Sequence, residues 1–92
     1  MSIADFLTEG EKDAVSLENL SISTGLPERI VKREVLQARL RGELILSSEN
    51  GYFLPSDPDE IKRYVFTRKA YLKTAHAALR PFLKAIKKAE GV

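Results

Sequence analysis

Residues 25–45 read GLPERIVKREVLQARLRGELI and contain one amphipathic helical segment between two glycines. At about 100° per residue, one narrow sector of this segment gathers Val31, Val35, Ala38 and Gly42. We therefore expect a helix over residues 27–42, with Pro27 in its first turn, Gly42 at its end and its apolar sector packed on other helices.

Two shorter helices are predicted before this segment. Ser2 and Asp5 are typical of an N-cap and its acidic partner in a first short helix. Ser16 predicts a second N-cap, and Gly25 ends the helix that follows it, over residues 17–24. That helix and the next meet at the sequence TGLP, and a tight glycine-containing turn between two short helices is the helix-turn-helix arrangement.

After Gly42 the hydrophobic period changes from that of a helix to that of strands. The runs ELILSS and YFLP are joined through Glu49, Asn50 and Gly51. An Asn-Gly pair between two β-prone runs predicts a hairpin.

A long helix is predicted from Asp57 onward. Asp57 is expected to cap it, with Pro58 in the first helical position and Glu60 reaching back as a capping-box partner. Pro81 cannot donate a hydrogen bond to the carbonyl of Ala77, so we expect a kink or break near it.

The order of these elements resembles the winged helix-turn-helix DNA-binding superfamily. The residues that carry the resemblance are Leu20, Gly25, Leu26, Val31, Val35, Ala38, Gly42, Leu44 and Ile45. The segment SSENGYFLPSDPDEI also looks like small winged-helix proteins of phages and mobile elements. Two positions depart from the family pattern: Pro27 stands where a Ser or Thr cap is common, and Thr24 where leucine is frequent.

The resemblance implies a mainly α fold with a small β-hairpin. Residues 1–56 would form the winged helix-turn-helix domain, and residues 57–92 a long amphipathic C-terminal helix used for dimerisation or packing.

In a helix-turn-helix, the outer face of the second helix enters the major groove near its amino end. The candidates for contact with DNA on this face are Arg29, Lys32, Arg33 and Gln37. Arginine pairs with guanine, glutamine with adenine, and either basic side chain neutralises phosphate. The alternative is a solvated face stabilised by pairs such as Glu28 with Lys32.

The wing offers weaker chemistry for DNA. Ser48 and Asn50 are further candidates for contact, but Glu49 would repel a phosphate. Leu36 and Leu40 lie opposite the apolar sector of the helix, and we expect them to pack on the C-terminal helix or on a second subunit.

The C-terminal helix carries an apolar stripe at alternating steps of four and three. Its members are Ile61, Val65, Leu72, Ala75, Leu79, Phe82 and Ile86, interrupted by Arg68. This is coiled-coil spacing and predicts a two-fold homodimer, against the alternative of a bent helix that folds back on its own core. Parallel and antiparallel pairing both fit. The basic side of the helix is read as a solvated surface, a second DNA-backbone contact or a membrane-surface face.

Positive charge is concentrated in two segments. The net charge is only +2, but residues 61–92 hold nine Lys and Arg residues against Glu90 alone, and residues 27–42 hold five against two acids. With a pI of about 9.0, this asymmetry indicates an anionic partner, which we expect to be double-stranded DNA.

Catalysis is not expected. The chain has no cysteine and one histidine, His76, and carries no Gly-rich phosphate loop, metal-ligand cluster or nucleophile signature. We expect no enzymatic activity, cofactor, metal or small-molecule effector. The amino end lacks a signal pattern and no apolar run is long enough for a membrane span, so a cytoplasmic protein without membrane contact is expected.

These observations predict a dimeric, sequence-preferring DNA-binding protein. Its role would be that of a transcriptional regulator or an accessory factor in phage or plasmid replication. One alternative is a protein-interaction scaffold that docks through its C-terminal helix. Another is a nonspecific, chromatin-like binder that contacts mostly phosphates.

Overall fold

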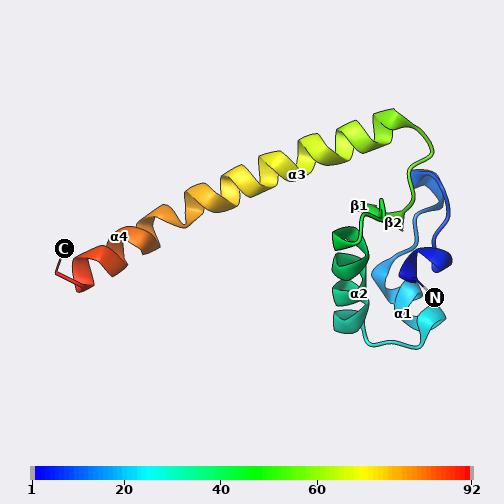
Figure 1. Ribbon diagram of the computed structural model, residues 1–92, viewed down its shortest axis with the longest axis horizontal. Helices are drawn as coiled ribbons and strands as arrows, with labels where there is room; N and C mark the ends of the chain where they lie inside the picture. Colours follow the sequence, from blue (N-terminus) through cyan, green and yellow to red (C-terminus); the bar gives the residue numbers. More distant parts are fainter. Residues whose placement is uncertain (1, 92) are drawn as a thin grey trace.

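The computed structural model describes residues 2–91 and shows a small helical body from which one long helix projects (Figure 1). The elements are η1 (Ile3–Phe6), η2 (Glu11–Asp13), α1 (Leu17–Thr24), α2 (Glu28–Leu40), β1 (Leu46–Ser48), β2 (Gly51–Phe53), α3 (Pro58–Ala78) and α4 (Arg80–Ala89). The predicted fold class is confirmed: a mainly α chain in which a helix-turn-helix and a small wing-like hairpin precede a long C-terminal helix.

The predicted helix starts follow from local capping. Ser2 and Asp5 form a reciprocal capping box at η1, which is a 3₁₀ helix. The Ser16 hydroxyl accepts a hydrogen bond from the backbone N–H of Asn19 at 3.1 Å and caps α1. Gly25 ends α1 with φ 73°, a left-handed conformation that costs glycine little.

The turn between α1 and α2 is held by hydroxyl groups. Pro27 is the N-cap of α2 rather than its first helical residue, and it offers no side-chain cap. Instead, Thr24 Oγ1 donates to the carbonyl of Leu20 at 2.8 Å and accepts from the N–H of Leu26 at 3.3 Å. The Ser21 hydroxyl donates to the carbonyl of Leu26. Pro27 and Thr24, the two positions that depart from the pattern of the superfamily that the sequence resembles, therefore lie in a turn with its own side-chain hydrogen bonds.

The hydrophobic core lies between η1, α1 and α2, and the residue just before β1 also contributes to it. Its buried members are Ile3, Leu7, Leu20, Val31, Val35, Ala38 and Ile45. The predicted inner face of α2 is confirmed, since Val31, Val35 and Ala38 are all buried. Burial of this face fixes which side of α2 remains exposed.

The hairpin is anchored to the body by an isolated β-bridge between Val15 and Tyr52. Val15 and Tyr52 exchange two backbone hydrogen bonds of 2.8 Å. This pairing explains Gly51, which has φ 122° and whose added Cβ would lie 2.3 Å from the carbonyl oxygen of Val15. The prediction that Gly51 belongs to the turn is wrong: Glu49 and Asn50 make the turn, and Gly51 begins β2.

The start of α3 is tied to the body through a buried carboxylate. Asp57 caps the helix as predicted and accepts from the N–H of Glu60 at 2.9 Å. The expected capping-box role of Glu60 is wrong, because its side chain accepts from Ser56 and from the N–H of Glu11 instead. The carboxylate therefore links α3 to η2.

Beyond its first turns, α3 leaves the body and ends at Ala78, and α4 continues after the break at Leu79 (Figure 1). Pro81 lies just after the break and has no N–H for the helical ladder. The Cα radius of gyration is 17.0 Å, against about 12 Å for a compact chain of this length. The helix thus extends well past the core.

Candidate nucleic-acid interface

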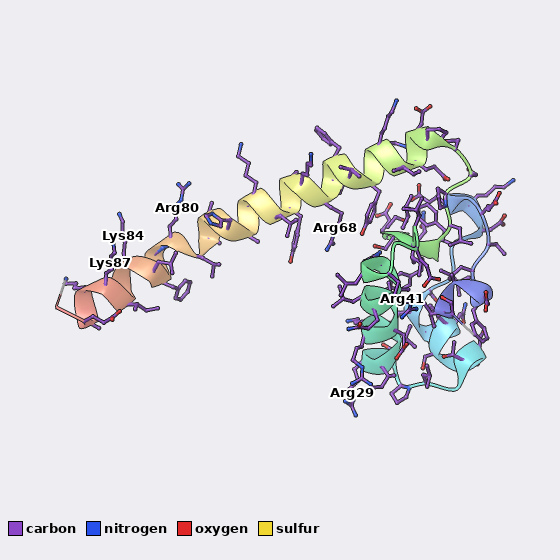
Figure 2. The ribbon with its side chains drawn as sticks, in the orientation of Figure 1. Arg29, Arg41, Arg68, Arg80, Lys84 and Lys87 are labelled. Carbon is purple, nitrogen blue, oxygen red and sulfur yellow. The ribbon has the colours of Figure 1, made fainter. Side chains whose placement is uncertain are left out.

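The outward side of α2 presents the polar residues predicted for DNA contact. Arg29, Lys32, Arg33 and Gln37 are all exposed, and Figure 2 shows Arg29 at the start of α2 pointing away from the body. We call these four the α2 contact set. None of their side chains makes a hydrogen bond or ion pair within residues 2–91, and the Glu28–Lys32 pair of the alternative interpretation is not formed.

Arg39 lies on the same helix, but its side chain contacts other parts of the protein. Its Nε donates to the carbonyl of Ile45 at 2.8 Å, and its guanidinium also donates to the Ser47 hydroxyl at 3.2 Å. The guanidinium lies 5.4 Å from the ring centroid of Tyr64 on α3, a cation–π distance. Arg39 therefore connects α2 with β1 and α3, and its guanidinium is occupied by contacts within the protein.

Arg41 is neutralised locally by Glu43. Their salt bridge is 3.0 Å long, and Glu43 also accepts a hydrogen bond from the Ser2 hydroxyl. The Ser2 hydrogen bond, followed by those from Arg41, holds the pKa of Glu43 below its ordinary value against the opposing effect of desolvation. Arg39 and Arg41 thus contact other residues of the chain. The basic side chains of α2 without such contacts in the described chain are Arg29, Lys32 and Arg33, in its amino-terminal half.

The wing residues are exposed but face acidic groups. The Ser48 hydroxyl accepts from the N–H of Asn50 at 3.1 Å, and the Asn50 amide donates to the carboxylate of Glu11 at 3.4 Å. In the described chain, no contact therefore joins Ser48 or Asn50 to the α2 contact set.

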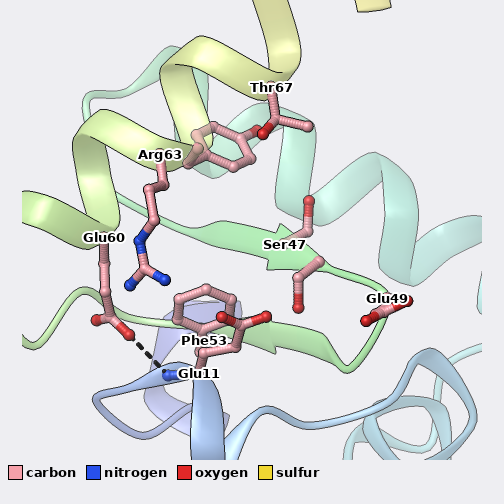
Figure 3. Close-up of a pocket in the computed structure, with 9 residues that line it drawn as sticks. Glu11, Ser47, Glu49, Phe53, Glu60, Arg63 and Thr67 are labelled. Atoms are coloured by element: carbon pink, nitrogen blue, oxygen red, sulfur yellow. Dashed lines mark hydrogen bonds between the residues drawn. The ribbon is translucent and has the colours of Figure 1, made fainter.

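A shallow pocket of about 370 Å³ lies between the hairpin and α3 (Figure 3). Its lining includes three carboxylates, those of Glu11, Glu49 and Glu60, and the side chain of Arg63 points into it. The space between the wing and α3 is therefore lined by three carboxylates, from η2, the wing and α3, against the single guanidinium of Arg63. Such a surface repels phosphate rather than attracting it.

The expectation that Leu36 and Leu40 pack on the C-terminal helix is wrong. Their exposed fractions are 52% and 72%, and Leu44 beyond them is 57% exposed. The reason is the path of α3, which contacts β1 and the Arg39 side chain and then runs away from the body. That a second subunit covers Leu36 and Leu40 stays a prediction.

The apolar stripe of the C-terminal helix is largely uncovered. Ile61 and Ala75 are partly buried, whereas Val65, Leu72, Leu79, Phe82 and Ile86 are exposed. The helix does not fold back on the core, so the bent-helix alternative is not what the structure shows. The basic residues Arg80, Lys84 and Lys87 lie along one side of α4, as Figure 2 shows.

Within residues 2–91, no three or more His, Cys, Asp and Glu side chains are grouped so as to hold a metal ion. No helix in the same range has the length and apolar character needed to cross a bilayer. Comparisons with protein-family models, curated proteins and solved structures find no match to this chain.

Proposed function

We propose that the protein is a winged-helix DNA-binding protein that inserts α2 into the major groove of a duplex. The observation that carries the proposal is the α2 contact set: four exposed polar side chains, three of them basic, without a partner in the described chain. They project from a helix whose opposite side is buried in the core.

The dimensions and chemistry of α2 suit this role. Its 13 residues span about 20 Å, and the major groove admits one α-helix. Arg29 and Arg33 lie one helical turn apart and supply guanidinium groups for guanine or phosphate. Gln37 follows one turn later and has the amide geometry that pairs with adenine.

The uncovered stripe on α3–α4 supports a dimer. A two-fold pair presents two copies of α2, which meet successive major grooves when they lie about 34 Å apart. A small dimer of this kind fits a transcriptional regulator or an accessory factor in phage or plasmid replication.

Fluorescence anisotropy with a labelled duplex tests DNA binding. Each of the two arginines that neutralises a phosphate contributes about 0.9 to the slope of log K against log salt. Arg29→Ala/Arg33→Ala should therefore weaken binding at least tenfold and flatten that slope. The matched control is Lys12→Ala/Lys62→Ala, which removes the same charge from two exposed positions outside α2. Equal losses in both variants, or binding that survives in the first, would contradict the role of α2.

The second candidate function is a scaffold that docks through its C-terminal helix, and the exposed Leu72, Leu79 and Phe82 favour it. Selection from random duplexes separates the candidates. A sequence-preferring protein returns a motif, a nonspecific binder returns bound DNA without a motif, and a scaffold returns neither.

A further inference from the structure

The C-terminal helix carries a straight row of positive charge. At about 100° per residue, five of its cations fall within one sector of about 60°. These five side chains are all exposed, and we call them the basic row: Lys69, Lys73, Arg80, Lys84 and Lys87. At 1.5 Å per residue, the row is about 27 Å long.

The row continues from α3 into α4 because the break between the two helices is mild. Leu79, at the break, keeps right-handed helical angles, φ −80° and ψ −18°. Figure 2 shows Arg80, Lys84 and Lys87 along one side of the helix, and Arg68, which is outside the row, on the other side. The two helices therefore present the row as one surface.

Neighbouring residues do not neutralise this charge. From Ile61 to Ala89 the chain has no acidic residue, and Glu90 is the first one after α4. Within residues 2–91, the five side chains of the row make no hydrogen bond or ion pair. Lys62 lies in the same sector, but acidic residues surround it at the start of α3, namely Asp57, Asp59 and Glu60. The positive surface therefore begins beyond the first turns of α3.

The row faces away from the body. On α3, the side chains that face the body are those of Glu60, Tyr64 and Thr67. Glu60 accepts a hydrogen bond from η2, Tyr64 lies under the Arg39 guanidinium, and Thr67 lines the pocket beside the hairpin. The row lies about 160° around the helix from these three residues. The helix itself therefore stands between the row and the body that carries the α2 contact set.

The backbone of a DNA duplex is the anion that fits this row best. A duplex is straight over this length and carries one negative charge for about every 1.7 Å of its axis, whatever its sequence. Lysine and arginine neutralise such phosphates without reading bases. A bilayer fits less well, because a membrane-surface helix buries its apolar side. Arg68, which interrupts the apolar stripe, points to the side of the helix on which the body lies (Figure 2), so the body would obstruct a bilayer there.

We propose that the basic row binds the phosphates of a second stretch of duplex, separate from the stretch that contacts α2. The protein then holds two DNA segments, one through α2 and one through a sequence-independent contact on α3–α4. This second contact rests on the DNA binding of the proposed function. It is compatible with the proposed dimer, because the row lies about 110° around the helix from the apolar stripe that would form the seam.

A bridging assay tests the proposal. A biotinylated duplex on beads is loaded with the full chain, washed and offered a second, fluorescent duplex, which wild type should retain. Lys73→Gln/Lys84→Gln should retain at least about fivefold less, because two phosphate contacts are lost. The matched control is Arg63→Gln/Arg68→Gln, which removes the same charge from exposed positions of the same helix outside the row. The control should retain as much of the second duplex as wild type.

Salt titration by fluorescence anisotropy gives a second readout. In an Arg29→Ala/Arg33→Ala background the contact through α2 is weakened, and the remaining binding reports the row. Adding Lys73→Gln/Lys84→Gln should then flatten the slope of log K against log salt by about 1.8, which is two phosphate contacts. With α2 intact, the same two substitutions should leave the affinity for one short duplex unchanged.

Three results would overturn the second contact. The first is a wild-type chain that bridges no duplexes. The second is equal bridging by wild type and Lys73→Gln/Lys84→Gln, because the two α2 helices of a dimer would then account for it. The third is a row variant that keeps bridging but loses binding to anionic phospholipid vesicles, which would assign the row to a membrane. The proposed function fails on a different result, which is undiminished binding of a single duplex by Arg29→Ala/Arg33→Ala.

Discussion

The carboxylate of Glu60, in the first turn of α3, accepts a hydrogen bond from the backbone N–H of Glu11 at 2.9 Å. It also accepts from the N–H and the hydroxyl of Ser56 at 2.7 and 2.8 Å. Figure 3 shows the bond to Glu11 beside the pocket under α3. This carboxylate therefore fixes the start of the long helix against the amino-terminal body.

These contacts predict a pH dependence of stability. The hydrogen bonds from the backbone of Ser56 and then of Glu11 lower the pKa of Glu60 below its ordinary value of 4.5. A carboxyl with a lowered folded-state pKa stabilises the fold above its unfolded pKa, and this contribution is lost as pH falls through the folded value. Glu60→Gln should lower Tm at pH 7 by several degrees, about 4–8 °C. The difference from wild type should shrink below pH 4.

Thermal melts followed by circular dichroism between pH 7 and pH 3 measure this effect. The matched control is Glu90→Gln, which removes the same charge from an exposed residue. Equal Tm changes in the two variants at pH 7 would show that the Glu60 contacts do not stabilise the fold.

Gly51 provides a second prediction about stability. Alanine at this position would place Cβ 2.3 Å from the Val15 carbonyl oxygen and would keep φ at 122°. Gly51→Ala should therefore cost at least about 2 kcal/mol. Gly25→Ala is the control, since Gly25 also has positive φ but has no atom within 4 Å of an added Cβ, so its cost should be about 1 kcal/mol. Urea unfolding gives both values, and equal costs would contradict the close approach of Val15.

Elements whose signals are local could be predicted from the sequence. The caps at Ser2, Ser16 and Asp57 depend on residues within one helical turn, and the inner face of α2 follows from its period. The pairing of Val15 with Tyr52 could not be predicted, because a single residue carries no strand pattern. The same holds for Glu60, whose capping-box pattern fits Asp57 while its actual partner is 49 residues away.

The candidate site likewise combines features that could be predicted from the sequence with features that could not. The outward direction of Arg29 and Arg33 follows from helical angles once the core face is known. The commitment of Arg39 depends on Tyr64 and Ser47, and the sequence does not show that these residues meet it. The prediction that Leu36 and Leu40 pack on the C-terminal helix was wrong because contacts at the first turns of α3 set its path. No local sequence pattern encodes those contacts.

Arg39 should behave differently from the α2 contact set. Arg39→Gln removes the guanidinium contacts with Ile45, Ser47 and Tyr64. Loss of such a partly buried network should lower the free energy of unfolding by about 1–3 kcal/mol. The salt slope of duplex binding should not change, because Arg39 contacts the protein. A stable variant with a flattened salt slope would place Arg39 in the DNA interface instead.

Association through the helix predicts a clear effect of charge in the seam. Leu72→Glu/Leu79→Glu should convert the dimer to a monomer, because it buries two carboxylates at the pairing face. The control is Phe66→Glu, which changes an apolar residue that is 77% exposed and lies outside the stripe. Light scattering at tens of micromolar reports the mass. A dimer that tolerates the double substitution would remove α3–α4 from the interface.

The central claim is that the outer side of α2 contacts the duplex, and backbone amide shifts during titration with DNA test it most directly. With the ¹⁵N-labelled full chain, the largest shifts are predicted between residues 24 and 37, which cover the turn and the α2 contact set. The amides of α3 and α4 should change little. Shifts confined to α3–α4, with the amides of Arg29, Lys32 and Arg33 unmoved, would contradict the claim.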